Sequence, residues 1–123
     1  KEMVKKRIQV VGSKILVMGL SFKENCPDIR NTKIVDMVES LKEYELDLDI
    51  YDPWVDVNEA ELEYGLTPVN KLEQGKYDAI ILAVAHDQFK EMSIKKFHIL
   101  GKEKYVLYDL KYVLDKMESD IRL

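Results

Sequence analysis

Short hydrophobic runs alternate along the chain with segments whose hydrophobic residues recur every three or four positions. Four of the runs are nearly continuous in apolar character, as is typical of strands covered on both faces. These predicted strands are residues 14–19, 48–51, 77–85 and 105–108. A less regular stretch, 66–69, is a candidate edge strand, because Pro68 would be poorly tolerated inside a sheet.

Helices are predicted between these strands. Residues from about 30 to 44 carry an apolar stripe at helical spacing. The candidate caps at its start are Asp28, Asn31 and Thr32. A shorter helix is predicted between Asp56, a favoured N-cap residue, and Gly65, a common C-terminal stop. A further helix is predicted over 93–100, before Gly101.

The alternation of strands and helices predicts an α/β fold with a parallel sheet. We expect a Rossmann-like, three-layer open sheet, mostly parallel, with about four or five strands and helices on both faces. Ligands of such sheets bind at the carboxyl ends of the strands, near the point where the strand order reverses. The loops that matter for function are therefore 20–31, 52–56, 86–89 and 109–111.

Composition narrows the class of protein. The 123 residues suit one domain, and 19 basic and 23 acidic residues are spread along the chain, which gives no support to nucleic-acid binding. The longest apolar run, 79–85, is too short to span a membrane. Cys26 is the only cysteine, which fits a reducing, cytoplasmic setting and excludes an intrachain disulfide. No metal site is predicted, because His86 and His98 lack suitable partners.

The loop after the first predicted strand suits an anionic ligand, but not through the usual dinucleotide motif. Gly19 is its only glycine, so the G-x-G-x-x-G pattern is absent. Phe22 and Lys23 stand where glycines would be needed. An ammonium contact from Lys23, assisted by the following helix N-terminus, is the natural substitute. The alternative is that Lys23 and Arg30 are ordinary solvated charges.

The same loop resembles the start of the C-terminal domain in the UDP-glucose/GDP-mannose dehydrogenase family. The matching positions are Gly19, Phe22, Lys23, Asp28, Arg30 and Thr32. The segment FKENCPDIRNT is most similar to the branch that acts on UDP-N-acetylhexosamines in bacterial polysaccharide biosynthesis. The resemblance continues through Tyr51-Asp52-Pro53, Tyr77-Asp78-Ala79, Ala85-His86 with Phe89, Asp109-Leu110-Lys111 and the last four residues.

The resemblance implies a set of substrate-binding residues. Phe22 and Lys23 would contact the UDP-sugar, and Lys111 would stand where many members carry an arginine. Lysine keeps the charge at that position but lacks the bidentate fork. Arg30 is a further candidate, although with Asp28 it would instead brace the loop and cap the helix. No catalytic residue is expected here, because the family's catalytic cysteine lies in a different motif from Cys26.

The resemblance also implies a larger protein. Residues 1–12 would be the tail of a helix from a central domain, and 13–123 the C-terminal UDP-binding domain. The full-length enzyme would use NAD, bound by a domain absent here, to oxidise the C6 alcohol of a UDP-N-acetylhexosamine or UDP-glucose to the uronic acid. It would form a homodimer or larger assembly, and the present chain alone would be inactive.

Two other functions stay open at the level of the sequence. One is a stand-alone, Rossmann-like nucleotide-binding module without catalysis. The other is a small NAD-binding domain in which Asp52, at the end of the second strand, binds the ribose. The turn chemistry of Asp52-Pro53 favours a strand-ending turn instead. His86, at the end of the strongest strand, would make a polar contact near the cleft.

Overall fold

The computed structural model describes residues 1–111, 113–114 and 119–122. Strands and helices alternate through this part of the chain, as the hydrophobic pattern predicts. The strands are β1 (Lys14–Met18), β2 (Asp47–Tyr51), β3 (Tyr77–Leu82), β4 (Gly101–Asp109) and β5 (Ile121–Arg122). The helices are α1 (Glu2–Lys5), α2 (Ile34–Lys42), α3 (Val57–Tyr64), α4 (Asp87–Lys90) and α5 (Ile94–Leu100).

The five strands form one parallel sheet in the order β2-β1-β3-β4-β5. From β1 the chain moves outward to β2, then returns across β1 and proceeds in the other direction through β3, β4 and β5. The strand order therefore reverses between β1 and β3. Met18 pairs with both Tyr51 and Leu82, and Leu82 pairs with Asp109, so four strands end at the same level.

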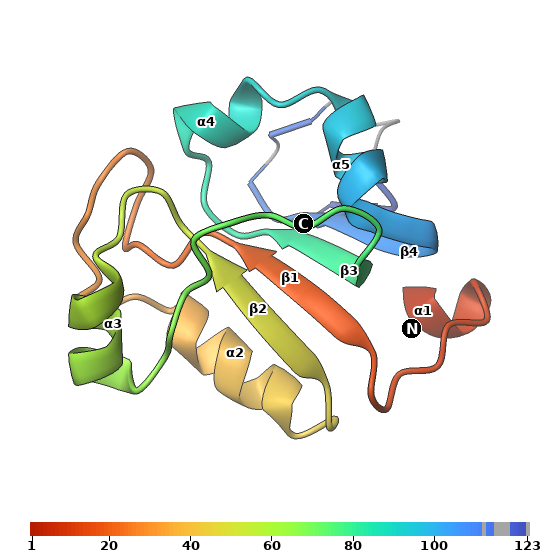
Figure 1. The fold of residues 1–123 in the computed structure, drawn as a ribbon, viewed down its shortest axis with the longest axis horizontal. Helices are drawn as coiled ribbons and strands as arrows, with labels where there is room; N and C mark the ends of the chain where they lie inside the picture. The colour runs from red at the N-terminus through yellow and green to blue at the C-terminus, as the bar shows by residue number, and fades with distance from the viewer. Residues whose placement is uncertain (112, 115–118, 123) are drawn as a thin grey trace.

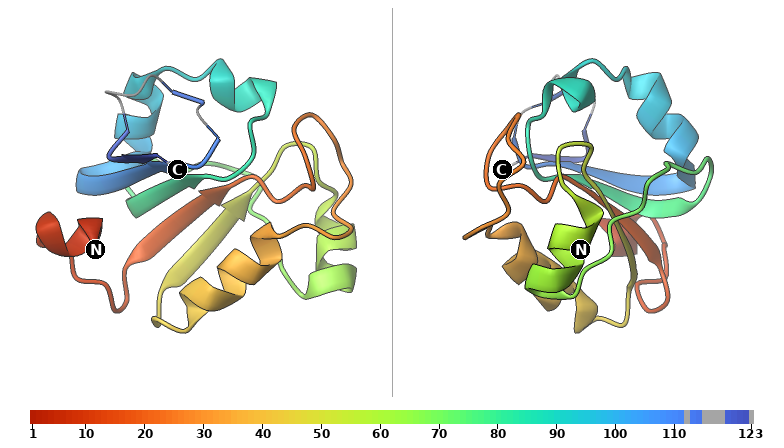
Figure 2. Two further views of the ribbon diagram at one scale, coloured as in Figure 1. Left: turned by 180° about the vertical axis from the view of Figure 1, so that it is seen from behind. Right: turned by 60° about the vertical axis from the view of Figure 1, so that its left-hand side comes forward.

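Helices cover both faces of the sheet, which confirms the predicted three-layer α/β fold. Figures 1 and 2 show α2 and α3 on one side of the sheet and α4 and α5 on the other. The two faces of the sheet pack into two separate hydrophobic cores, because successive side chains of a strand point to opposite faces. Ile15 and Val17 of β1 belong to the core under α2 and α3, and Leu16 and Met18 to the core under α4 and α5. All six residues of β3 are buried, as its continuous apolar run predicts.

Both predicted ends of α3 are confirmed. The carboxylate of Asp56 accepts a hydrogen bond from the Glu59 amide, and Gly65 ends the helix in the left-handed conformation with φ 67°. The predicted helix over 93–100 is also confirmed, with Ser93 at its N-cap and Gly101 after it.

Other boundaries were wrong. Helix α2 begins at Ile34 and not near Arg30, because Asn31 adopts a left-handed φ of 58° that interrupts a helix. Its N-cap is Lys33, which makes no side-chain capping bond, although the Thr32 hydroxyl accepts from the Ile34 amide.

The predicted edge strand at 66–69 is absent, and one backbone bond joins the Val69 amide to Ile50 on β2. The fifth strand is instead β5, in the polar tail, where no strand was placed. The single turn α4 falls in a segment expected to be a loop, because one helical turn is too short to show periodicity. Helix α1 covers only part of the segment that was expected to be a helical tail.

Candidate functional site

The loops that leave β1 and β3 meet at the point where the strand order reverses. Gly19, directly after β1, has φ 111°, and a Cβ built there would lie 2.6 Å from the Val84 Cβ and 2.8 Å from the Val84 amide nitrogen. Only glycine allows both this backbone conformation and this close approach. The sequence at position 19 therefore determines how closely the two ligand-side loops pack.

A cleft of about 270 Å³ opens above this contact. Its walls come from the β1–α2 loop, the first residues of α2, the segment after β3 and the turn after β4. The lining residues are Ser21, Phe22, Lys23, Glu24, Asn31, Thr32, Lys33, Ile34, Ala83, Val84, Ala85 and Lys111. This is the position at which open parallel sheets bind ligands.

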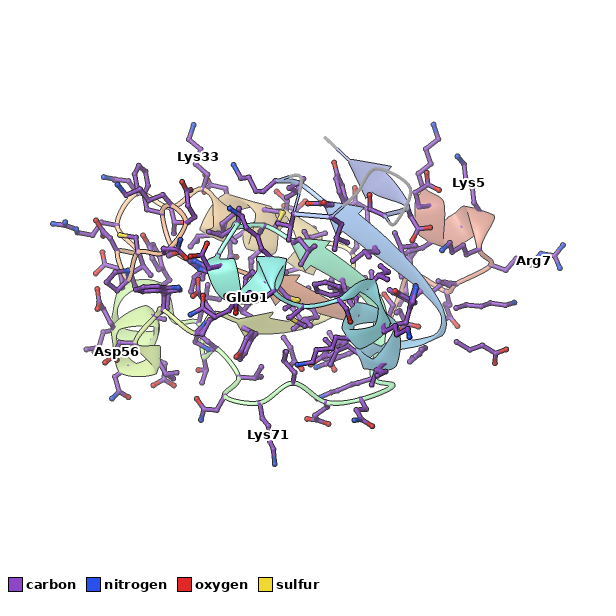
Figure 3. The ribbon with its side chains drawn as sticks, turned by 90° about the horizontal axis from the view of Figure 1, so that it is seen from above. Lys5, Arg7, Lys33, Asp56, Lys71 and Glu91 are labelled. Atoms are coloured by element: carbon purple, nitrogen blue, oxygen red, sulfur yellow. The ribbon has the colours of Figure 1, made fainter. Side chains whose placement is uncertain are left out.

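Three lysines outweigh the one carboxylate, Glu24, among the residues that line the cleft. Lys23, Lys33 and Lys111 line it and are exposed, and none forms an ion pair with the acidic residues in the described ranges. Lys33 stands at the start of α2, where its side chain extends away from the body of the molecule (Figure 3). The N-terminus of α2 adds its own partial positive charge beside these ammonium groups. The cleft is therefore suited to a compact anion with several charges.

Beneath the cleft, a buried carboxylate ties three loops together. Asp52 follows β2 and is only 6% exposed. Its Oδ2 accepts from the amides of Leu20 (2.7 Å) and Ser21 (3.0 Å) and from Nε2 of His86 (3.0 Å). Its Oδ1 accepts from the Trp54 amide at 2.8 Å. The carboxylate thus fixes the first residues after β1 against the loops after β2 and β3.

The pKa of Asp52 reflects this environment. Burial alone would raise the pKa of the carboxyl group, because it penalises the charged form. The hydrogen bonds from His86 and from the backbone amides of Leu20, Ser21 and Trp54 outweigh burial and hold the pKa of Asp52 below its ordinary value of 3.8. Asp52 is consequently ionised in the folded protein at neutral pH.

The same contacts bear on the alternative in which Asp52 binds the ribose of NAD. An acidic residue at the end of β2 would have to offer its oxygens to a ribose. Both Asp52 oxygens are already used by protein donors, and the glycine pattern that admits a pyrophosphate is missing. The Asp52 side chain is also fully buried, so it does not fit the ribose contact on which the NAD-binding alternative relied.

A second buried carboxylate shapes the turn after β4. Asp109 is fully buried, and its oxygens accept from the amides of Lys111 (3.2 Å), Val113 (3.0 Å) and Leu114 (2.8 Å). The Leu110 amide donates to the Leu82 carbonyl oxygen on β3 at 3.1 Å. These bonds hold the turn so that Lys111 lines the cleft opposite the β1–α2 loop.

Of the four candidate binding residues, the structure brings three together. Phe22, Lys23 and Lys111 line the same cleft. Arg30 does not line it, and its guanidinium makes a bidentate contact with the Asp28 carboxylate at 3.0 and 3.1 Å. This pair lies on the outside of the loop, and the Asp28 carbonyl oxygen also accepts from the Phe22 amide. The expected bracing of the loop is thus present, whereas Asp28 does not cap α2.

The two histidines and Cys26 do not line the cleft. His86 is completely buried and does not line the cleft, and His98 contacts the Tyr105 hydroxyl on another side of the domain. Cys26 is half-buried in the β1–α2 loop. Among the residues that the structure describes, no group of three His, Cys, Asp or Glu side chains could hold a metal ion. No described helix has the length and apolar character needed to cross a bilayer.

Sequence reasoning missed the two carboxylates that organise the site. Asp52 was interpreted as a strand-ending turn and Asp109 only as part of a motif. A signal was present, because an aspartate that directly follows a buried strand commonly accepts amide hydrogen bonds from the next turn. The contribution of Lys33 was also missed, since it was counted within the predicted helix and not at its start.

Comparisons with known proteins agree on one family. A family model described as the UDP-binding domain of the UDP-glucose/GDP-mannose dehydrogenase family matches residues 16–116. The whole chain is 56% identical to the UDP-N-acetyl-D-glucosamine 6-dehydrogenase of Pseudomonas aeruginosa and 54% identical to that of Salmonella typhi. It is 36% identical over 121 residues to Protein CapL of Staphylococcus aureus. The chain spans only 29%, 29% and 28% of the length of these three relatives.

Solved structures support the fold. An NDP-N-acetyl-D-galactosaminuronic acid dehydrogenase from Methanosarcina mazei superimposes with a TM-score of 0.81 at 21% identity, over 94% of this chain and 24% of that one. A UDP-D-ManNAc dehydrogenase from Pyrococcus horikoshii gives 0.77 at 22% identity, over 98% of this chain and 27% of that one. At such low identity the likeness shows a shared fold.

Proposed function

The chain belongs to the UDP-glucose/GDP-mannose dehydrogenase family, whose UDP-binding domain it contains, and on this premise we propose that its cleft holds the diphosphate of a UDP-sugar. One observation carries the proposal. Lys23 and Lys111 come from opposite ends of the sequence, yet both line a single cleft at the point where the strand order reverses. A diphosphate has the size and the charge that this arrangement would stabilise.

Each wall of the cleft has a role in the proposal. Lys23 and Lys111 neutralise the phosphates from two sides, and the N-terminus of α2 with Lys33 adds positive potential from a third. Phe22 is 57% exposed at the cleft and offers an aromatic face to the uridine. Arg30 contributes indirectly, by holding Asp28 and with it the conformation of the loop.

The larger reaction follows from the relatives. In a polypeptide of their length, the substrate would be a UDP-N-acetylhexosamine. UDP-N-acetylglucosamine is favoured because two relatives, at 56% and 54% identity, are named as UDP-N-acetyl-D-glucosamine 6-dehydrogenases. NAD, bound elsewhere in that polypeptide, would accept the hydrides as the C6 alcohol becomes a carboxylate. The residues described here bind the nucleotide end and orient the sugar, so their contribution to rate is binding energy and positioning. By itself this chain would reduce no NAD.

We also propose a domain boundary near residue 12. Residues 1–12 would link the UDP-binding domain to a central helical domain, through which subunits would pair. Met3 and Ile8 pack against the main core, and the Lys6 ammonium contacts the Tyr105 carbonyl oxygen at 2.7 Å, so the linker would be held against the domain.

Amide-resolved NMR titration of the chain tests the proposal. UDP should shift the amides of Ser21, Lys23, Ile34 and Ala85, which line the cleft, and leave those of α5 unchanged. Uridine should bind more weakly than UDP, because it lacks the phosphates. NAD should not reproduce the UDP pattern. Shifts confined to another surface, or equal binding of uridine and UDP, would contradict the proposal. A stand-alone nucleotide-binding module would show the same shifts. It would differ from the proposal in one respect, because a longer polypeptide that contains it would have no dehydrogenase activity.

A further inference from the structure

The middle of the β1–α2 loop, residues 22–28, is held in place mainly by hydrogen bonds, whereas Leu20 and Ile29 on either side of it are packed in the core. From position 22 to 25 every residue is exposed, and the next buried side chain is Ile29. Apolar packing therefore contributes little to the conformation of the segment that carries Lys23. Two hydrogen bonds hold the backbone at this lysine and two residues after it. The Ser21 hydroxyl donates to the Lys23 carbonyl oxygen at 3.0 Å, and the Asn25 amide donates to Nδ1 of His86 at 2.9 Å.

The hydrogen bonds define the tautomer of the His86 ring. Because the Asn25 amide needs an acceptor, Nδ1 carries no proton. The ring proton is on Nε2, which donates to the ionised Asp52 carboxylate at 3.0 Å and lies 3.2 Å from the Ser21 Oγ. His86 thus links a buried anion, fixed by the amides at the end of β1, to the far side of the Lys23 segment.

Asn25 completes the connection. It has a left-handed φ of 54°, and its side-chain oxygen accepts from the Asp87 amide at 3.0 Å. The loop is therefore clamped at one residue, by its amide to His86 and by its side chain to the start of α4. The clamp lies only two residues beyond Lys23.

We propose that His86 is a positioning residue for UDP-sugar binding, which holds Lys23 in the cleft through the Asn25 amide. The proposal rests on the proposed function, since it assumes that Lys23 contacts the ligand. His86 itself cannot touch a ligand, because it is completely buried and both ring nitrogens are engaged. Its effect on affinity must therefore pass through the loop, and in particular through Lys23.

Two substitutions separate the two sides of the ring. His86→Asn places an amide oxygen near the position of Nδ1, so it can still accept from Asn25 but cannot reach Asp52. His86→Gln places an amide NH₂ near the position of Nε2, so it can donate to Asp52 but leaves the Asn25 amide without an acceptor. His98→Asn is the matched control, because His98 is the other histidine of the chain and contacts Tyr105 away from the cleft.

Calorimetric titration with UDP should show about a tenfold loss of affinity for His86→Gln, the effect of one ordinary hydrogen bond, and little change for His86→Asn and His98→Asn. In a Lys23→Ala background, His86→Gln should have almost no further effect, since the residue acts through Lys23. Equal losses in the Asn and Gln variants, or a full tenfold loss that persists without Lys23, would overturn the proposal.

A ligand-free measurement keeps this proposal separate from the proposed function. In the unsubstituted chain, long-range ¹H–¹⁵N spectra should show the Nε2–H tautomer of His86, and the Asn25 amide should exchange slowly for an exposed loop residue. An Nδ1–H tautomer or unprotected exchange at Asn25 would overturn the positioning role whatever UDP does. If these signals are as expected but Lys23→Ala leaves UDP affinity unchanged, the proposed function fails and the loop clamp does not.

Discussion

The Val84 side chain occupies the space that any side chain at position 19 would need. A Cβ at Gly19 would lie 2.6 Å from the Val84 Cβ and 2.8 Å from its backbone nitrogen, and the φ of 111° is one that other residues rarely adopt. This contact brings the loops after β1 and β3 together directly under the proposed UDP site. The stability of the domain and the geometry of its cleft therefore depend on the same pair of residues.

Gly19→Ala should destabilise the domain by more than about 3 kcal/mol, from backbone strain plus a clash with backbone that cannot move aside. Gly75→Ala is the matched control, because Gly75 also has a positive φ (63°) but no atom within 4 Å of a built Cβ. It should cost only about 1 kcal/mol. Denaturant unfolding measures both values, and similar losses for the two variants would contradict the role of Val84.

The N-caps of α3 and α5 differ in their side-chain hydrogen bonds, which allows a test of local capping. Asp56→Ala should lower the free energy of unfolding by about 1 kcal/mol, because the Asp56 carboxylate accepts from the Glu59 amide. Ser93→Ala, at the N-cap of α5, should cost less, since Ser93 makes no side-chain capping bond. Thermal or urea unfolding gives the two values. UDP affinity should not change in either variant, so a weakened complex would show that α3 or α5 takes part in binding.

The buried carboxylate of Asp52 should make stability depend on pH. The pKa of Asp52 in the folded protein is lower than the unfolded value of about 3.8. The ionised carboxylate therefore contributes fully to the free energy of unfolding above about pH 3.8, and this contribution is lost as the pH falls through the folded pKa. Asp52→Asn should destabilise the domain at pH 7 by about 2 kcal/mol, because charge-assisted bonds are lost. The difference from the unsubstituted chain should shrink as the pH is lowered below about 3.8. Urea unfolding at several pH values measures this difference, and a constant difference would contradict the pKa direction.

Asp109 should control affinity through the turn that carries Lys111. Its carboxylate accepts from three backbone amides, including that of Lys111. Asp109→Asn should therefore weaken UDP binding about as much as Lys111→Ala, by several-fold, since a misplaced charge and a missing one have similar consequences. The double variant should bind about as well as either single variant. Fully additive losses in a calorimetric double-mutant cycle would show that Asp109 acts independently of Lys111.

The hydrophobic pattern was sufficient for the architecture. Fully buried β3 reads as a continuous apolar run, and the Asp56 and Gly65 signals placed α3 because both act through bonds within a few residues. The start of α2 was placed too early, because the left-handed conformation of Asn31 depends on the fold of the whole loop. The strand β5 was missed because its pairing with β4 is long-range and its two residues are too few to show a pattern.

For the site, the sequence predicted the charges but not their support. Lys23 and Lys111 were singled out by the motifs that contain them, and the structure brings both to one cleft. The contacts of Asp52 with Leu20, Ser21 and His86 join residues more than thirty positions apart. No spacing along the chain encodes such contacts, so they became visible only when the sheet aligned the ends of its strands.

The most direct test of the account is the UDP affinity of Lys23→Ala measured beside that of Lys71→Ala. Both variants remove one positive charge, but Lys71 lies on the opposite side of the molecule from Lys33 and the cleft that Lys33 lines (Figure 3). Lys23→Ala should weaken binding by about tenfold or more, as expected for the loss of a charge-assisted contact with phosphate, and Lys71→Ala should leave it within about twofold. Equal affinities of the two variants for UDP would contradict the assignment of the cleft.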